Sequence, residues 1–293
     1  MAMTRRLPAL VAAILLSAGA ALAGPLVDIR PDGRPAALPI QPVNVIDGTD
    51  DRDSLIALGP ALGLSPQEID RIRMVSGYVG CLSPSPSLGS GALFLTNRQI
   101  LTAGHIFFEA SGRKRSKCFF KNQDRAPVMI DLLVDDDNAR FGAVPPKSGS
   151  NNDFAVVRLA APLAGGAPFP VADGVAVKAG DALIVVTSHP AGMMREVANT
   201  VPVVQECKIR RAPKSSSTTS FYRSDCDATG SSSGGMNLSR VNGELVFRGI
   251  TITTGPWRDG AFFGAPYDEK SGSVTTALGT DAAIFAAGRE LAD

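Results

Sequence analysis

Ser233 stands in a glycine-rich run, GSSSGG at residues 230–235, where its hydroxyl could act as a nucleophile. A serine hydroxyl is a weak nucleophile near neutral pH, so it needs an adjacent base that a carboxylate orients. The chain has only two histidines, and one of them, His105, follows the strand-like segment LTAG at 101–104. These residue types predict nucleophilic catalysis at Ser233 with His105 as the base.

A candidate orienting carboxylate lies between the histidine and the serine. Asp153 opens the apolar, β-branched run FAVVRL at 154–159. Other acidic residues offer the same chemistry, namely Asp50, Asp51 and residues 135–137. Only Asp153 precedes an apolar, β-branched strand-like run. The second histidine, His189, precedes a proline and is predicted to lie in a loop. The order His, Asp, Ser is that of the chymotrypsin-like arrangement, whereas subtilisin-like and α/β-hydrolase chains use other orders.

The motifs around these residues resemble those of trypsin-like (chymotrypsin-fold) serine proteases over roughly residues 76–291. LTAGH at 101–105 is similar to that family's LTAAH motif, and Ser233 with its two following glycines matches the end of GDSGG. The spacings, 48 residues from His105 to Asp153 and 80 from Asp153 to Ser233, suit a protease with two barrels. VIDGTDDR at 45–52 further resembles a bacterial secreted branch similar to glutamyl-endopeptidase-like proteases.

The resemblance implies an all-β fold of two six-stranded antiparallel β-barrels of chymotrypsin type, with a C-terminal helix. It also implies a secreted serine endopeptidase that hydrolyses peptide bonds through an acyl-enzyme. Ser233 would attack, His105 would shuttle the proton, Asp153 would orient the imidazole, and the N–H groups of Ser231 and Ser233 would form the oxyanion hole. A lipase or esterase is disfavoured, because no Gly-x-Ser-x-Gly elbow surrounds Ser233.

Departures from the family pattern leave an alternative open. Ser231 and Ser232 stand where the family carries Gly and usually Asp or Asn, so a catalytically inactive trypsin-fold binding protein is the second hypothesis. Ser232 also removes the carboxylate to which a trypsin-type N-terminal amine would bind. If the segment that begins at Val45 became the N-terminus, it would therefore have to be anchored elsewhere.

Asp227 bears on substrate specificity. It lies six residues before Ser233, the spacing at which trypsin-like members carry an aspartate at the base of the S1 pocket. A buried carboxylate there would select Arg or Lys side chains. The alternative is that Asp227 only braces its own loop beside Cys226. The pocket wall is expected from three further residues, Thr253, Thr254 and Gly255.

Composition and organisation agree with an exported β-barrel protein. The 293 residues include 30 Gly and 21 Pro, with short apolar runs between them. Residues 1–23 resemble a signal peptide with an Ala-x-Ala cleavage site. We expect a leader or pro-segment with a short helix over 24–74, an N-terminal barrel carrying His and Asp over 75–165, and a C-terminal barrel carrying Ser with the terminal helix over 166–293. Export could end in the periplasm or outside the cell.

The four cysteines of an exported chain predict two disulfides. Three pairings are possible, and we favour Cys81–Cys118 with Cys207–Cys226 because each pair then lies within one barrel. Without a CxxC motif or a nearby histidine pair, no metal site and no cofactor are expected. The formal net charge of +1 becomes −1 when Arg5 and Arg6 leave with the signal, which favours no nucleic-acid or membrane partner. A monomer acting on protein or peptide substrates is expected.

Overall fold

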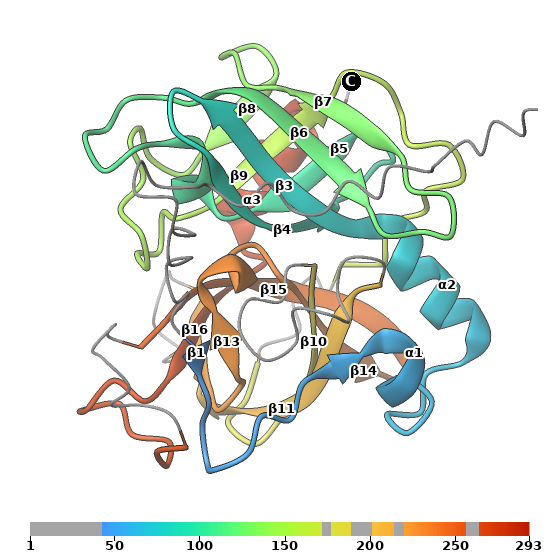
Figure 1. Ribbon diagram of the computed structural model, residues 1–293, viewed down its shortest axis with the longest axis vertical. Helices are drawn as coiled ribbons and strands as arrows, with labels where there is room; N and C mark the ends of the chain where they lie inside the picture. The colour runs from blue at the N-terminus through green and yellow to red at the C-terminus, as the bar shows by residue number, and fades with distance from the viewer. Residues whose placement is uncertain (1–42, 172–176, 189–200, 214–219, 256–263, 293) are drawn as a thin grey trace, which may run out of the picture. The chain divides into compact units, whose positions relative to one another are not determined.

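The structure is a computed structural model that describes residues 43–171, 177–188, 201–213, 220–255 and 264–292. All of them belong to the unit Gln41–Asp293. Strands dominate this unit, and they close into two six-stranded antiparallel barrels with a helix near the C-terminus (Figure 1). The all-β chymotrypsin-like fold expected from the sequence is therefore confirmed. No helix within the described ranges is long and apolar enough to cross a membrane.

The first barrel has the strand order β5-β4-β3-β6-β7-β9 and is closed by the pairing of β5 with β9. A seventh strand, β8, extends the sheet at β9. Its strands are β3 (Ser76–Ser83), β4 (Ser87–Leu93), β5 (Gln99–Thr102), β6 (Ser116–Asn122), β7 (Met129–Leu133), β8 (Ala139–Phe141) and β9 (Ala155–Leu159). In β7, Ile130 and Leu132 are buried while Met129 and Asp131 are exposed, as the period of two along a strand requires.

The second barrel has the strand order β10-β14-β15-β16-β12-β11 and is closed by the pairing of β10 with β11. Its strands are β10 (Ala182–Thr187), β11 (Val203–Arg211), β12 (Phe221–Ser224), β14 (Met236–Val241), β15 (Glu244–Thr254) and β16 (Thr275–Gly279). The β14–β15 hairpin turns at Asn242 and Gly243, both with positive φ, which is the conformation that a two-residue Asn-Gly turn favours.

The residues before the first barrel contribute short elements to the second. Strand β1 (Val43–Asn44) pairs with β13 (Ala228–Thr229), and β2 (Asp53–Ser54) pairs with β11. This part of the predicted leader is thus hydrogen-bonded into the fold. The proposed boundaries of the leader and of the two domains stay predictions.

Three helices accompany the barrels: α1 (Leu55–Leu58), α2 (Pro66–Val75) and α3 (Ala282–Glu290). The capping pattern of α2 is the one that its sequence indicates, because Ser65 accepts from the Glu68 N–H and Glu68 accepts in return. Phe94, the residue after β4, makes aromatic contacts with the second barrel and with α3. Its ring lies 6.0 Å from that of Phe247 in β15 and 6.0 Å from that of Phe285 in α3.

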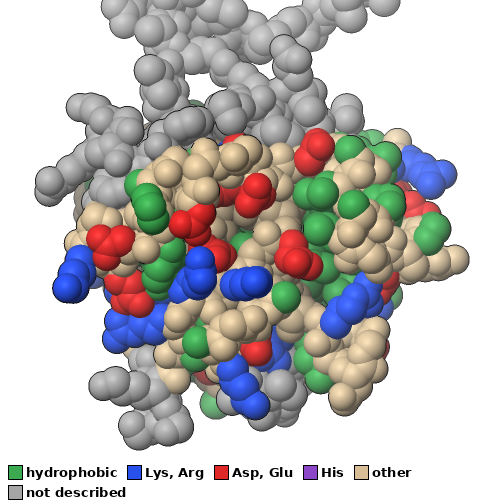
Figure 2. All heavy atoms as spheres, turned by 90° about the horizontal axis from the view of Figure 1, so that it is seen from below, with side chains coloured by type: hydrophobic (Ala, Val, Ile, Leu, Met, Phe, Trp, Pro, Cys, Tyr) green, Lys and Arg blue, Asp and Glu red, His purple; other side chains and the backbone are tan. Residues whose placement is uncertain are grey.

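The surface in Figure 2 carries acidic and basic side chains close together. Ion pairs join segments of the described chain; examples are Arg210 with Asp225, Arg211 and Arg223 with Glu269, and Arg240 with Glu68. Mixed charge of this kind creates no strong field of one sign.

The structure contains both disulfides that the sequence predicted, Cys81–Cys118 and Cys207–Cys226. Cys81 in β3 lies directly opposite Cys118 in β6, so the first bridge links neighbouring strands within one barrel. The second bridge joins β11 to the residue before Asp227, and it therefore holds the chain that leads to the Ser233 turn.

Replacing Cys81 and Cys118 together by Ser should lower the free energy of unfolding by about 2–5 kcal/mol, because the unfolded chain gains conformational freedom. Urea unfolding of both proteins under non-reducing conditions measures the difference. In this variant a reductant can then break only the Cys207–Cys226 disulfide. A double variant as stable as the parent protein would show that this bridge contributes nothing.

Candidate active site

His105 and Asp153 form a close pair in the first barrel. His105 lies in the short 3₁₀ helix η1 (Gly104–Phe107), directly after β5, and Asp153 immediately precedes β9, which pairs with β5. The His105 Nδ1 atom lies 2.8 Å from Asp153 Oδ2, and the His105 backbone N–H donates to Oδ1 at 2.9 Å. A third donor, the Gly149 N–H, reaches Oδ2 at 2.8 Å. Both oxygens of the buried Asp153 carboxyl group therefore have hydrogen-bond partners.

This pairing determines how the imidazole can act. An ionised carboxylate only accepts hydrogen bonds, so His105 Nδ1 must carry a proton in this contact. In the neutral ring the other nitrogen, Nε2, then remains available to accept a proton. The His105 side chain is 27% exposed, whereas the Asp153 side chain is fully buried. The imidazole can thus meet a substrate while its orienting acid is shielded from water.

Ser233 follows the 3₁₀ helix η3 (Gly230–Ser232), and this turn is held against β4 of the first barrel. The Ser90 N–H donates to the Ser233 carbonyl at 2.8 Å, and Ser90 Oγ donates to the Ser231 carbonyl at 3.1 Å. Gly234 has φ of +82°, and a Cβ atom there would lie 1.9 Å from the Ser90 carbonyl oxygen. Only glycine fits this position, so the Ser-Gly-Gly pattern is a backbone requirement of the turn.

A pocket of about 70 Å³ lies between His105 and Ser233. Both residues line it, together with Ser148, residues 228–230 and residues 251–254. Thr253 and Thr254, which the sequence suggested for the pocket wall, are among the lining residues. Gly255 follows them, and its backbone packs against Gly272. Among the described residues that line it, none has a carboxylate, ammonium or guanidinium group, so this part of the lining is neutral apart from the imidazole and rich in hydroxyls.

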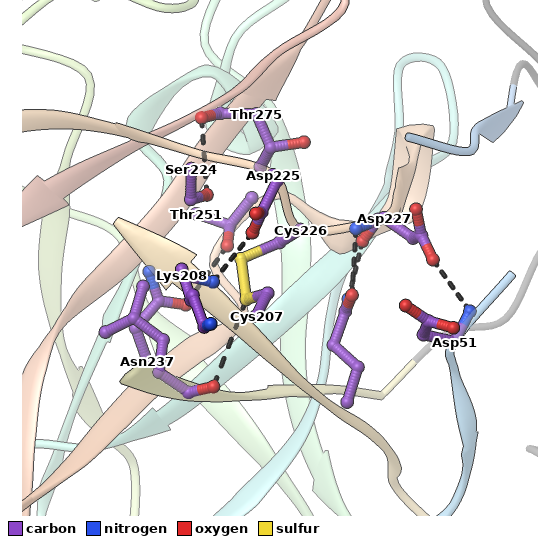
Figure 3. The surroundings of a disulfide bond; sticks show 12 residues. Asp51, Cys207, Lys208, Ser224, Asp225, Cys226, Asp227, Asn237, Thr251 and Thr275 are labelled. Carbon is purple, nitrogen blue, oxygen red and sulfur yellow. Dashed lines mark hydrogen bonds between the residues drawn. A yellow bond between two sulfur atoms is a disulfide. The ribbon is translucent and has the colours of Figure 1, made fainter. Parts of the chain in front are cut away.

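Asp227 is buried, but it is not among the residues that line this pocket. One carboxylate oxygen, Oδ1, accepts from the Ile46 N–H at 2.8 Å. The other, Oδ2, accepts from the Asp51 N–H at 2.8 Å (Figure 3). Its backbone is fixed by Gln205, whose amide bonds to both the N–H and the carbonyl of Asp227. The carboxylate therefore faces residues 46–51, and this placement gives no support to a role in binding substrate side chains. Its observed partners are in residues 46–51 rather than in the loop beside Cys226 that the alternative named.

Burial raises the pKa of Asp227 to about 6, from an ordinary value of 3.8. The main cause is desolvation, which disfavours the charged form, and the nearby Asp50 carboxylate acts in the same direction. The Ile46 and Asp51 N–H groups and the Arg52 guanidinium oppose the increase.

Ser232, the residue before the candidate nucleophile, has taken a local role. Its buried Oγ accepts from the Thr229 N–H at 3.0 Å and completes a capping box at the start of η3. The carboxylate that trypsin-like chains carry at this point is absent, as the sequence indicated. Ser231 lies inside η3, and the participation of its N–H and that of Ser233 in an oxyanion hole stays a prediction.

Several residues of the site escaped the sequence analysis. Ser148 and Thr229 line the pocket, Ser90 holds the serine turn, and Gln205 fixes Asp227. Of these four residues, only Ser90 lies in a recognisable sequence motif, the strand-like run GSGALFL at residues 89–95, which precedes His105. Residue His189 lies outside the described residues. Among the residues that the structure describes, no group of three or more His, Cys, Asp or Glu could hold a metal ion.

Two closed antiparallel barrels, with a His–Asp pair of one facing a Ser-Gly-Gly turn of the other, define the chymotrypsin-fold class. A family profile described as the trypsin-like peptidase domain matches residues 89–246, which is more than half of the chain. The chain therefore belongs to the trypsin-like peptidase family. No protein with curated annotation matches it.

Solved structures show the same fold at low sequence identity. A Glu endopeptidase aligns with a TM-score of 0.61 and 14% identity, over 85% of this chain and all of the other. The protease Anisep from Arthrobacter nicotinovorans aligns with a TM-score of 0.54 and 14% identity, over 75% of this chain and 96% of the other. The thermostable serine protease AL20, from an extremophilic microorganism, gives a TM-score of 0.52 and 14% identity over 74% and 99%. At this identity the similarity establishes the fold alone.

The raised pKa of Asp227 predicts a pH-dependent stability. Between about pH 4 and 6 the folded protein keeps a proton on Asp227 that the unfolded chain releases, so the free energy of unfolding falls as the pH rises through this window. The shift corresponds to about 2–3 kcal/mol. Asp227→Asn should remove this component. The free energy of unfolding of the parent protein, measured relative to Asp227→Asn, should therefore fall by that amount from pH 4 to pH 7.

Denaturant unfolding at each pH, for the parent protein and the variant, measures this difference. Asp131→Asn removes an exposed carboxylate from β7 and controls for the general loss of a negative charge. Parallel pH curves for the parent protein and Asp227→Asn would contradict the prediction.

Proposed function

We propose that this protein is an exported serine endopeptidase with Ser233 as nucleophile, His105 as general base and acid, and Asp153 as the group that orients His105. One observation carries the proposal: His105 is hydrogen-bonded to a buried Asp153 at 2.8 Å and lines the same pocket as Ser233. Membership of the trypsin-like peptidase family supports peptide hydrolysis as the reaction. The two disulfides support an oxidising compartment, periplasmic or extracellular.

The reaction proceeds in two halves. Ser233 Oγ attacks the carbonyl carbon of the scissile peptide while its proton passes to His105 Nε2. The resulting oxyanion accepts hydrogen bonds from backbone N–H groups, for which Ser231 and Ser233 are the candidates. His105 then gives the proton to the leaving amine, so the C–N bond breaks and an acyl-enzyme remains. A water molecule, deprotonated by His105, hydrolyses the ester and restores Ser233.

A fluorophosphonate probe tests this assignment directly, because it reacts only with an activated serine. The parent protein should be labelled on the peptide that contains Ser233, and Ser233→Ala and His105→Ala should each abolish labelling while they keep the fold. Ser239→Ala, which removes a hydroxyl from β14 outside the pocket, is the matched control and should be labelled like the parent protein. A folded parent protein that takes no label would favour the inactive, trypsin-fold binding protein instead.

The pocket between His105 and Ser233 also supports a proposal on specificity. The sequence suggested a preference for Arg or Lys, but that argument needs the Asp227 carboxylate in the pocket, and it faces residues 46–51. An Arg side chain in a neutral, hydroxyl-rich pocket would be buried without an ionic partner, which is costly. Hydroxyl groups can donate to an acceptor, so we propose Glu, Gln, Asp or Asn side chains at this position.

Cleavage of a peptide library should therefore disfavour Arg and Lys at the scissile residue by at least about tenfold against the best side chain. The measurement is the ratio of kcat/KM values for single-residue variants of the best peptide. Asp227→Asn should leave this order of preference unchanged, because its charge does not enter the pocket. A profile dominated by Arg, and lost in Asp227→Asn, would restore the S1 role of Asp227.

A further inference from the structure

Residues 43–52 lie against the back of the pocket wall as a docked segment. Strand β1 pairs with β13, so Val43 is opposite Thr229 and Asn44 is opposite Ala228. On the other side the Val45 carbonyl accepts from the Gly264 N–H at 2.9 Å, and the Asp47 N–H donates to the Ala265 carbonyl at 2.9 Å. Val45 and Ile46 are buried, at 0% and 2% exposed. The segment thus fills a slot between two parts of the second barrel.

Asp227 is the polar anchor of this segment. Its two oxygens each bind one backbone N–H of the segment, from Ile46 and from Asp51, at 2.8 Å in both cases. The chain between these donors turns through Asp47 and Gly48, which both have positive φ. A single carboxylate therefore closes the loop 46–51. If the segment left, Asp227 would lose both of these donors.

A second buried contact stabilises the end of the segment. The Arg52 guanidinium makes a bidentate contact with the Asp50 carboxylate, through Nε to Oδ1 and Nη2 to Oδ2, each at 2.7 Å. The two side chains are 2% and 4% exposed. A forked pair of this kind fixes the orientation of both side chains.

The other side of β13 belongs to the candidate active site. Ala228, Thr229 and Gly230 line the pocket with His105 and Ser233. Thr229 also caps η3, the turn that ends at Ser233. Only one strand therefore separates the docked segment from the pocket, and Asp227 is the residue immediately before that strand.

We propose that residues 43–52 form an intramolecular activating segment, and that Asp227 is the positioning residue through which its docking holds the pocket wall 228–230 and the Ser233 turn in place. The proposal rests on the proposed function, since its effect is on that site. The donors to Asp227 are internal backbone N–H groups, so docking needs no terminal amine. It differs in this respect from a switch that requires cleavage to create an N-terminus.

The first test uses full-length Asp227→Ala and Asp227→Asn. Both variants should lower kcat/KM, with Asp227→Ala lower by at least about tenfold, because loss of the wall's support misplaces the substrate. The loss should appear in kcat as well as in KM, since the segment is proposed to support both the Ser233 turn and the pocket wall. Asp227→Asn should recover part of it because its amide keeps one acceptor. Asp131→Asn is the charge control, and Ile130→Ala in β7 is the control for lost stability; both should keep the parent kcat/KM well below their unfolding temperatures.

The second test is hydrogen exchange, which does not depend on activity. In Asp227→Ala the N–H groups of residues 44–52 and those of residues 228–233 should exchange faster together, while β3 and β6 keep their protection. Ile46→Ser, which perturbs the segment from its own side, should produce the same paired change. The double variant Ile46→Ser, Asp227→Ala should exchange little faster than either single variant, because both substitutions break the same contact between the segment and Asp227.

The outcomes separate the two proposals. If the parent protein takes no fluorophosphonate label, the proposed function fails, but paired exchange of 44–52 and 228–233 would still show the docking. If the parent protein is labelled and Asp227→Ala keeps its kcat/KM, the activating role is wrong although the protease assignment stands. The activating role would also be wrong if the N–H groups of residues 44–52 exchanged faster in Asp227→Ala while those of residues 228–233 did not change. If Asp227→Ala does not fold, Asp227→Asn and Ile46→Ser carry the same tests.

Discussion

The contact of Ser90 with the Ser233 turn is the constraint on which the rest of the site depends. Ser90 lies in the first barrel, yet its N–H and Oγ donate to the carbonyls of Ser233 and Ser231, and its Oγ accepts from the Ser188 N–H. Its own carbonyl accepts from Thr102, two residues before the η1 turn that carries His105. One residue thus sets the nucleophile turn of the second barrel against the histidine strand of the first. Gly234 is required because this approach leaves no room for a Cβ atom.

The residue before Ser233 is a serine in this chain, and the buried carboxylate near this turn is Asp227. Ser232 replaces the acid that precedes the nucleophile in trypsin-like chains, and its hydroxyl caps a local turn. Asp227, at the start of the same loop, instead binds the N–H groups of the segment 46–51. A neutral hydroxyl at 232 could not bind an ammonium group as a carboxylate would, whereas backbone N–H groups need only an acceptor. Anchoring an internal segment and losing the acid at 232 are therefore compatible changes.

The sequence predicted those parts of the structure that local patterns encode. The triad candidates, both disulfide pairs, the α2 cap and α3 all follow from motifs or from spacing. Among the described residues, seven strands were not predicted from the sequence, namely β1, β2, β6, β8, β13, β14 and β16, although the Asn242-Gly243 pair is a strong hairpin signal for β14. The direction of the Asp227 carboxylate could not be predicted, because its partners Ile46 and Asp51 are backbone groups about 180 residues away. Backbone donors have no sequence signature.

The two buried carboxylates of the site show how position decides the role of one functional group. Asp153 receives three N–H donors, and one of them is the imidazole of the proposed general base. Asp227 receives two donors, and both belong to a segment that has only to stay in place. Stabilising a charge that develops on a neighbour requires an acid that stays ionised, whereas holding a backbone loop requires only acceptors. Asn at 153 should therefore disable the chemistry, and Asn at 227 should weaken only the support around it.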